Sequence, residues 1–383
     1  MRRFFTFLKW IFIILIIFVL HAYLTGNTHV FKTLSYTILK GRLSPGIDTY
    51  KTFPTRKVRN GTPQPWPEDP QYGKVSIDKK YTDILEKHQS AAFLVIHDGK
   101  LLYEDYFAGY NSHSLTNSWS MAKSIISLLV GVAIKEGKIK SVNQEVADFL
   151  PEYAGTGLKI RHLLTMSSGI NFKEQYINPY GYTAKALYGR DLKTLNSKYR
   201  VNHVPGQYFI YLSGNTQVLG FLLIKATGRN LSDYASEKIW RKIGAENPAY
   251  WSLDETGGTE KAFCCFHSNA RDFARIGQLM LQHGIWGSDT IISPSYFNAS
   301  TSLSKIKLLE GGRNDRYGYQ WWIAHYKGLD ITYARGIAGQ YIITIPAKNL
   351  IIVRLGKKRD DTKIKGHSKD FYEYVDAALG LLD

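Results

Sequence analysis

The chain has 383 residues, of which 44% are hydrophobic and 14% aromatic, and its formal net charge at pH 7 is +17. This length and apolar content suffice for one large domain or two medium ones with a buried core. The positive charge favours anionic neighbours, or else forms a solvated basic face. No zinc-finger, RNP or basic-zipper pattern accompanies the charge, so nucleic acid is not an expected partner.

The first 24 residues predict a membrane anchor. Arg2, Arg3 and Lys9 accompany an apolar run that reaches residue 24 and has roughly the 20 residues that a bilayer requires. A cleaved signal peptide would end in small residues of the A-x-A type, whereas the sequence here continues HAYLTGN. The pattern therefore favours an uncleaved signal anchor in a single-pass protein of the cell membrane, with the rest of the chain facing the periplasm or the exterior.

Residues 25–75 lack a clean periodicity and predict an extended spacer. Within them, PQPWPEDP, residues 63–70, holds four of the chain's twelve prolines, a composition typical of extended linkers. We expect this spacer to hold the globular part, residues 76–383, away from the membrane.

The globular part begins and ends in strand patterns. In AAFLVIHDGKLLYEDYF, residues 91–107, two apolar runs flank an Asp-Gly pair, which predicts a hairpin. A second hairpin is predicted over residues 340–356, followed by an amphipathic helix over residues 369–382. The middle, residues 138–285, reads mostly as helix and loop. The sequence therefore predicts an α+β fold, with an antiparallel sheet flanked by helices and a helical subdomain.

The only two cysteines, Cys264 and Cys265, are adjacent. A disulfide between neighbours requires a distorted peptide, so we expect two small buried residues and no disulfide framework. The eleven histidines form no H-E-x-x-H pattern and no tight cluster. The sequence therefore predicts no metal site.

Ser120 and Lys123 lie where a predicted helix begins, in NSWSMAKSIISLLVGVAIKEG, residues 117–137. Residues i and i+3 share a helix face, so the Lys123 amine can reach the Ser120 hydroxyl. The helix N-terminus favours a developing oxyanion, and burial lowers the pKa of a lysine. On this stretch alone, the alternative of a serine cap beside a snorkelling lysine remains open.

Two further stretches carry candidate site residues. In PGQYFIYLSGNTQVLG, residues 205–220, Tyr211 and Ser213 precede an apolar helix. In YARGIAGQYIIT, residues 333–344, Gly336 lies where a glycine lets the backbone approach a substrate closely. Taken singly, a core tyrosine and an ordinary turn are the simpler interpretations. The order and spacing of the three stretches together are much more specific.

Together these motifs resemble the serine hydrolases of the β-lactamase and penicillin-binding-protein superfamily, in the branch of class C β-lactamases, family VIII esterases and 6-aminohexanoate-dimer hydrolase. The resemblance runs from residue 93 to residue 356. It rests on SMAK, RHLLTMSSGI, YLSGNTQVLG, CCFHSNARDFARIGQLML, YGYQWWI and RGIAGQY, in that order. It implies a β-lactamase/transpeptidase-like fold and no cofactor, because nucleophile, base and oxyanion hole all come from the chain.

The resemblance implies a role for each candidate residue. Ser120 matches the acylated nucleophile, Lys123 its proton-transfer partner, and Tyr211 the tyrosine that shares a proton with the lysine. Ser213 matches the third position of a Tyr-x-Asn or Tyr-x-Ser motif. Ile337 matches the strand residue whose N–H forms the oxyanion hole with that of Ser120. The sequence leaves open whether Lys123 or Tyr211 takes the first proton.

The chain departs from the family pattern at two places. The third motif usually opens with Lys or His, but here it reads ARG, residues 334–336. This departure argues against efficient β-lactam hydrolysis, and Arg335 either replaces the missing cation or is a solvated strand residue. Residues 213–215, SGN, also fit the Ser-x-Asn motif of penicillin-binding proteins, which would make Tyr211 a bystander. We prefer the tyrosine interpretation.

We therefore expect a membrane-anchored serine hydrolase that cleaves a small-molecule ester or amide through an acyl-enzyme on Ser120. One alternative is a D-amino-acid peptidase or carboxypeptidase that acts on cell-wall peptides. Another is a non-catalytic, membrane-tethered protein that binds cell-wall polymers through its basic surface. The sequence identifies neither the substrate nor the oligomeric state.

Overall fold

The computed structural model describes residues 1–41 and 45–382. Its largest sheet has six strands in the order β11-β12-β13-β14-β2-β3, and each neighbouring pair is antiparallel. The strands are β2 (Ser90–His97), β3 (Lys100–Tyr106), β11 (Trp322–Tyr326), β12 (Leu329–Gly336), β13 (Gln340–Ile345) and β14 (Leu350–Gly356). Because β14 pairs with β2, strands from the two ends of the globular part form one sheet. Both predicted hairpins are confirmed.

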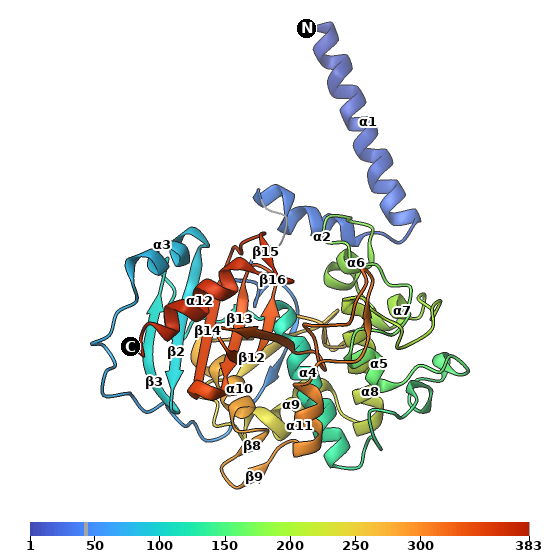
Figure 1. The fold of residues 1–383 in the computed structure, drawn as a ribbon. Helices are drawn as coiled ribbons and strands as arrows, with labels where there is room; N and C mark the ends of the chain where they lie inside the picture. Colours follow the sequence, from blue (N-terminus) through green and yellow to red (C-terminus); the bar gives the residue numbers. More distant parts are fainter. Residues whose placement is uncertain (42–44, 383) are drawn as a thin grey trace.

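Helices cover both faces of this sheet (Figure 1). Successive side chains of a strand point to opposite faces, and in β14 Ile352 packs with α12 (Lys369–Leu379) and α3 (Lys79–Lys87), whereas Ile351 packs with α10 (Ala270–Leu281). The strand is buried on both sides, which explains its continuous apolar sequence.

The helical subdomain surrounds one fully buried helix, α4. All residues of α4 (Ala122–Lys135) from Ala122 to Ala133 are buried, as expected of a helix that is apolar on every face. It packs against α8 (Ser213–Thr227), which also contacts α5 (Ile160–Leu164). The other helices of this subdomain are α6 (Tyr182–Tyr188), α7 (Leu192–Asn196), α9 (Leu231–Ala235) and α11 (Pro294–Ser300). The expected α+β fold with a helical subdomain is confirmed.

A second, four-stranded sheet takes two of its strands, β6 and β7, from residues 138–285, which the sequence predicts as mostly helix and loop. Its order is β1-β6-β7-β4, formed by β1 (Thr55–Val58), β6 (Ala249–Ser252), β7 (Phe266–Ser268) and β4 (Thr116–Asn117). Strands of two to four residues are too short to show a period-two pattern, which is why the sequence did not reveal them. Two-stranded pairs complete the fold: β5 (Tyr208–Phe209) with β10 (Lys307–Leu308), β8 (Ile285–Trp286) with β9 (Asp289–Thr290), and β15 (Lys363–Ile364) with β16 (His367–Ser368).

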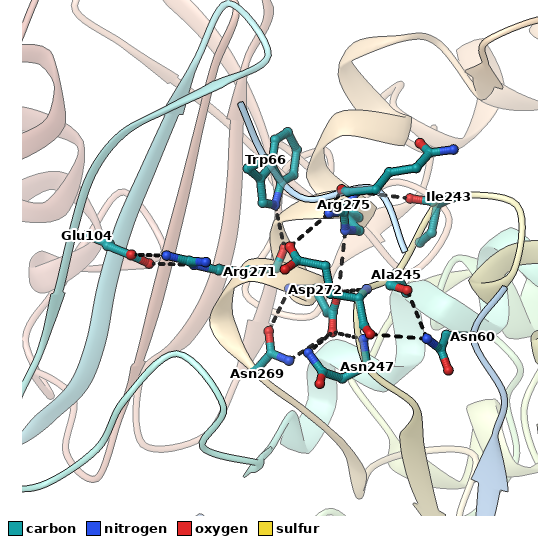
Figure 2. Close-up of polar contacts among 12 residues, drawn as sticks. Asn60, Trp66, Glu104, Ile243, Ala245, Asn247, Asn269, Arg271, Asp272 and Arg275 are labelled. Atoms are coloured by element: carbon teal, nitrogen blue, oxygen red, sulfur yellow. Dashed lines mark hydrogen bonds and ion pairs between the residues drawn. The ribbon is translucent and has the colours of Figure 1, made fainter. Parts of the chain in front are cut away.

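The proline-rich segment lies against the domain and is not a free spacer. The Trp66 indole N–H donates to the Arg271 carbonyl at 2.9 Å, and the Arg275 guanidinium lies 4.9 Å from the centre of the Trp66 ring (Figure 2). Upstream, β1 pairs with β6 and places Val58 in the core. The structure therefore corrects the spacer prediction for residues 45–75. Proline-rich sequences occur both in free linkers and in extended segments fixed to a surface, so the composition alone could not distinguish them. We call this fixed segment, residues 63–70, the strap.

The N-terminal helix α1 (Arg2–Leu24) projects away from the domain (Figure 1). With 23 residues it is long and apolar enough to cross a membrane, and its apolar stretch is not buried against the domain. The short helix α2 (His29–Tyr36) follows, and its Phe31 ring lies 5.8 Å from Phe18 and 6.0 Å from Tyr23 of α1. These aromatic contacts pack the end of α1 against α2, which lies on the surface of the domain.

The adjacent cysteines form a disulfide, which corrects the expectation of two unpaired residues. Cys264 and Cys265 are both buried, as expected, and their Sγ atoms are 2.15 Å apart. A disulfide between neighbours requires a distorted peptide, and Cys265 has a φ of +66°, in the left-handed region.

The packing of Trp66 can be tested by its contribution to stability. We expect Trp66→Ala to lower the free energy of unfolding by about 2 kcal/mol, because it removes a half-buried indole and its hydrogen bond. Urea denaturation of the full chain in detergent measures this loss. Pro63→Ala, an exposed change in the same segment, is the control. Equal stability of both variants and the wild type would show that the segment is a free spacer after all.

Candidate active site

Ser120 lies in a strained turn that leads directly into α4. The turn is the 3-10 segment η2 (Trp119–Met121), in which Trp119 has a φ of +47°. A bulky residue in this left-handed region costs of the order of 1–3 kcal/mol and persists only where its surroundings enforce it. Here the Trp119 N–H donates to Asn117 Oδ1 at 2.8 Å. A Cβ added at Gly336 of β12 would overlap the Ser118 carbonyl oxygen, so strand and turn lie in close contact.

The Lys123 amine is fully buried and directly contacts the Ser120 hydroxyl. Its Nζ lies 2.9 Å from Ser120 Oγ and 2.8 Å from the Phe263 carbonyl oxygen. Burial lowers the pKa of Lys123 to about 8, and the negative charge of Glu174 partly opposes that shift. At pH 7 about a tenth of the amine is therefore neutral and able to accept a proton, far more than for an exposed lysine.

Tyr211 approaches the same hydroxyl from the segment before α8. The Lys123 Nζ lies 5.3 Å from the centre of its ring, and the ring packs 5.7 Å from that of Trp322. Burial raises the pKa of the phenol well above its ordinary value, and an interaction with the Ser120 side chain offsets only part of that shift. The structure thus brings Ser120, Lys123 and Tyr211 together, with the phenol protonated at neutral pH.

Ser213 and Asn215 do not take part in this contact. Ser213, the first residue of α8, donates to Glu174 from its backbone N–H at 2.7 Å and from its hydroxyl at 2.6 Å. Asn215 is fully buried, accepts a hydrogen bond from Ser168 at 2.6 Å and lies 3.6 Å from the Met166 sulfur. Of the two alternatives for this motif, the tyrosine is the one whose ring faces the Lys123 amine.

Glu174 is a site residue that the sequence did not reveal. Besides the two bonds from Ser213, its carboxylate accepts a hydrogen bond from the Tyr176 hydroxyl at 2.7 Å. Its charge raises the pKa of Lys123. The sequence shows only a loop rich in aromatic residues at this point, and no local pattern links position 174 to a serine 39 residues later.

The third motif lies beside the Ser120 turn. Gly336 ends β12 against Ser118, and Ile337 follows it, with its carbonyl accepting a hydrogen bond from Gln340 Nε2 at 3.1 Å. The absence of a side chain at Gly336 is what allows this close approach, because a Cβ would also come within 3.0 Å of the Trp119 side chain. The backbone of Ile337 therefore lies next to the turn that carries Ser120.

Arg335 is not a solvated strand residue. Its guanidinium lies 3.6 Å from the centre of the Trp322 ring, and its positive charge lowers the pKa of Tyr211. The Nη1 atom is buried and has no hydrogen-bond partner among residues 1–41 and 45–382. A cation is thus present beside the phenol, although the family's usual Lys or His is missing.

Metal-ligating side chains do not gather at the site within the part of the chain that the structure describes. Among the residues that the structure describes, no group of three or more His, Cys, Asp or Glu side chains could hold one. The chemistry that the described groups support is proton transfer from a serine hydroxyl to a buried amine or phenol.

Comparison with known proteins agrees with the fold and the motifs. The family profile described as Beta-lactamase matches residues 77–370. The 6-aminohexanoate-dimer hydrolase of Paenarthrobacter ureafaciens is 27% identical over 301 residues, which cover 73% of this chain and 76% of that protein. A solved Bacillus anthracis structure, to which the name 6-aminohexanoate-dimer hydrolase is assigned provisionally, aligns with a TM-score of 0.74 at 23% identity, covering 91% and 94% of the two chains. A family VIII carboxylesterase aligns with a TM-score of 0.60 at 18% identity, covering 83% and 99%.

The influence of Glu174 on Lys123 can be measured through the reactivity of Ser120. We expect the rate of labelling by a fluorophosphonate to rise with pH around a midpoint near 8, because only the neutral amine accepts the Ser120 proton. In Glu174→Gln the negative charge that raises the Lys123 pKa is lost, so the midpoint should fall to a lower pH. Glu86→Gln, an exposed change on α3, is the control. A midpoint that stays in place or rises in Glu174→Gln would refute the electrostatic assignment.

Proposed function

The chain belongs to the beta-lactamase family and is a serine hydrolase of the esterase or amidase type, and we propose that it cleaves an ester or amide bond through an acyl-enzyme on Ser120. The observation that carries this proposal is the 2.9 Å contact between the Ser120 hydroxyl and the buried Lys123 amine. A serine hydroxyl is a weak nucleophile, and it requires a neighbouring base to remove its proton during attack.

The first step forms the acyl-enzyme. The neutral Lys123 amine accepts the Ser120 proton while Oγ attacks the substrate carbonyl carbon, and the carbonyl oxygen becomes an oxyanion. The backbone N–H groups of Ser120 and Ile337 would stabilise that charge. The tetrahedral intermediate then collapses, and the alcohol or amine leaves with a proton from the Lys123 ammonium or from Tyr211, which the ammonium reprotonates. Water repeats the sequence on the ester of Ser120 and releases the acid.

The electrostatics favour Lys123 as the base for the first proton. Burial lowers the pKa of the amine to about 8, whereas it raises the pKa of the phenol. The amine is therefore the group that becomes available as a base nearest to neutral pH. Tyr211, whose pKa responds to the same hydroxyl, would relay protons between Ser120, Lys123 and the leaving group.

Two observations support a linear amide or an ester as the substrate over the cyclic amide of a β-lactam. The relative from Paenarthrobacter ureafaciens is named for the hydrolysis of a 6-aminohexanoate dimer, an amide. In this chain the position that usually carries Lys or His is Ala334, and the nearby cation, Arg335, is stacked on Trp322. Labelling by a fluorescent penicillin would instead favour a peptidase of the cell wall.

The anchoring of this enzyme to a membrane is a further part of the proposal. The support for it is α1, which has the length and hydropathy of a membrane span and whose apolar stretch is not buried in the domain. We propose that α1 remains attached as a single-pass anchor and that the catalytic domain faces the periplasm or the exterior.

The assignment of Ser120 predicts the effect of removing one oxygen atom. We expect Ser120→Ala to abolish hydrolysis of a p-nitrophenyl ester, measured as kcat/KM, without loss of folding. Ser302→Ala is a matched control, because Ser302 and Lys305 show the same spacing but Ser302 is exposed. This control should retain the wild-type rate. Unchanged turnover in Ser120→Ala would place the nucleophile elsewhere.

A further inference from the structure

A polar cavity of about 590 Å³ lies between the end of α1 and the helical subdomain. Figure 1 shows the end of α1 close to α2, α6 and α7. We call this cavity the juxtamembrane pocket; the lining residues on which the argument depends are Tyr23, His29, Lys32, Lys185, Arg190 and Lys198. Its volume is in the range of small-ligand sites, and it is separate from the contacts around Ser120.

The charge of the juxtamembrane pocket is strongly positive. Of its lining residues four are cations, Lys32, Lys185, Arg190 and Lys198, and none of the four forms an ion pair with any residue in 1–41 or 45–382. The one lining carboxylate, Asp191, accepts a hydrogen bond from the Thr194 N–H at 3.0 Å. Four unpaired cations around one cavity create a potential that favours an anion with several acceptor oxygens.

A histidine in the pocket wall is neutral and does not add to this charge. Burial and the nearby charge of Lys185 lower the pKa of His29, and its Nε2 lies 2.8 Å from the Pro179 carbonyl oxygen. The Nε2 must therefore carry the hydrogen of that bond. The contact also fixes α2 against the loop before α6, so the pocket walls from the two elements are held together.

The position of the pocket relative to α1 indicates where its ligand comes from. Tyr23, in the last turn of the apolar helix, lines the pocket, and Phe31 of α2 packs against both Phe18 and Tyr23. Tyrosines at the end of a membrane span lie at the level of the lipid head groups. If α1 crosses a membrane, the cations of the pocket lie where lipid phosphates are concentrated.

We propose that the juxtamembrane pocket binds the phosphate group of an anionic membrane lipid. This inference rests on the proposed anchoring by α1 and is independent of the proposed chemistry at Ser120. Lysine and arginine side chains supply the donors that phosphate oxygens accept, and the turn between α1 and α2 places them beside the membrane surface. The bound lipid would fix the orientation of the domain above the bilayer.

The test uses the full chain reconstituted into nanodiscs of phosphatidylcholine with or without phosphatidylglycerol. After extraction in mild detergent, native mass spectrometry should detect one retained phosphatidylglycerol on the wild type. The triple variant Lys185→Gln, Arg190→Gln, Lys198→Gln should retain none. A control with the same change in charge, Lys138→Gln, Lys140→Gln, Lys225→Gln, alters exposed cations outside the pocket and should retain the lipid. Unchanged hydrolysis of a p-nitrophenyl ester by both variants verifies their folding.

Each contrary result identifies what has failed. Retention of phosphatidylglycerol by the pocket variant, or equal retention of phosphatidylcholine by the wild type, would overturn the lipid site while the anchor and the hydrolase assignment stand. Displacement of the lipid by an equal concentration of soluble glycerophosphate would overturn the membrane source and identify a free phosphate ester as the ligand. A chain that does not enter nanodiscs at all, yet hydrolyses the ester, would overturn the anchor and the lipid site together.

Discussion

The burial of one lysine amine is the constraint on which the rest of the site depends. Lys123 lies in a helix that is buried over more than three turns, and its Nζ contacts two neutral acceptors, Ser120 Oγ and the Phe263 carbonyl. Among the described residues it has no ion-pair partner, and an ammonium in such surroundings is costly. The amine therefore gives up its proton at a lower pH than an exposed lysine does, with a pKa of about 8, and folding itself produces the base.

The parts of the chain that hold this amine and its serine are far apart in sequence. The Phe263 carbonyl, which contacts the Lys123 amine, directly precedes the disulfide-linked pair Cys264 and Cys265. The strained turn that carries Ser120 lies against Gly336 of β12. The Glu174 carboxylate accepts a hydrogen bond from the first residue of α8. The site thus forms only where the sheet and the helical subdomain meet. Its geometry depends on how these two halves pack, which accounts for the pattern of motifs spread over residues 120–337.

Local patterns were sufficient to predict much of this arrangement. The Asp-Gly hairpin, the apolar helix after Ser120 and the hairpin of β13 and β14 each have a period or a turn signal in the sequence. The second sheet, the strap that carries Trp66 and the role of Glu174 have none. The strands of the second sheet are very short, and the prolines around Trp66 are as common in a linker as in a strap. The Glu174 carboxylate meets its partners only through tertiary packing. Long-range contacts of this kind leave no local trace in a single sequence.

The central claim is that Ser120 is activated by a buried amine and a phenol acting on one hydroxyl. The most direct measurement is kcat/KM of Tyr211→Phe for a p-nitrophenyl ester, because this change removes only the hydroxyl and keeps the ring packed on Trp322. Tyr317→Phe, in the neighbouring ring 6.1 Å away, is the control. The account predicts a loss of about 10²- to 10⁴-fold for Tyr211→Phe and little change for the control. A near-wild-type rate for Tyr211→Phe would contradict it and return the role to residues 213–215.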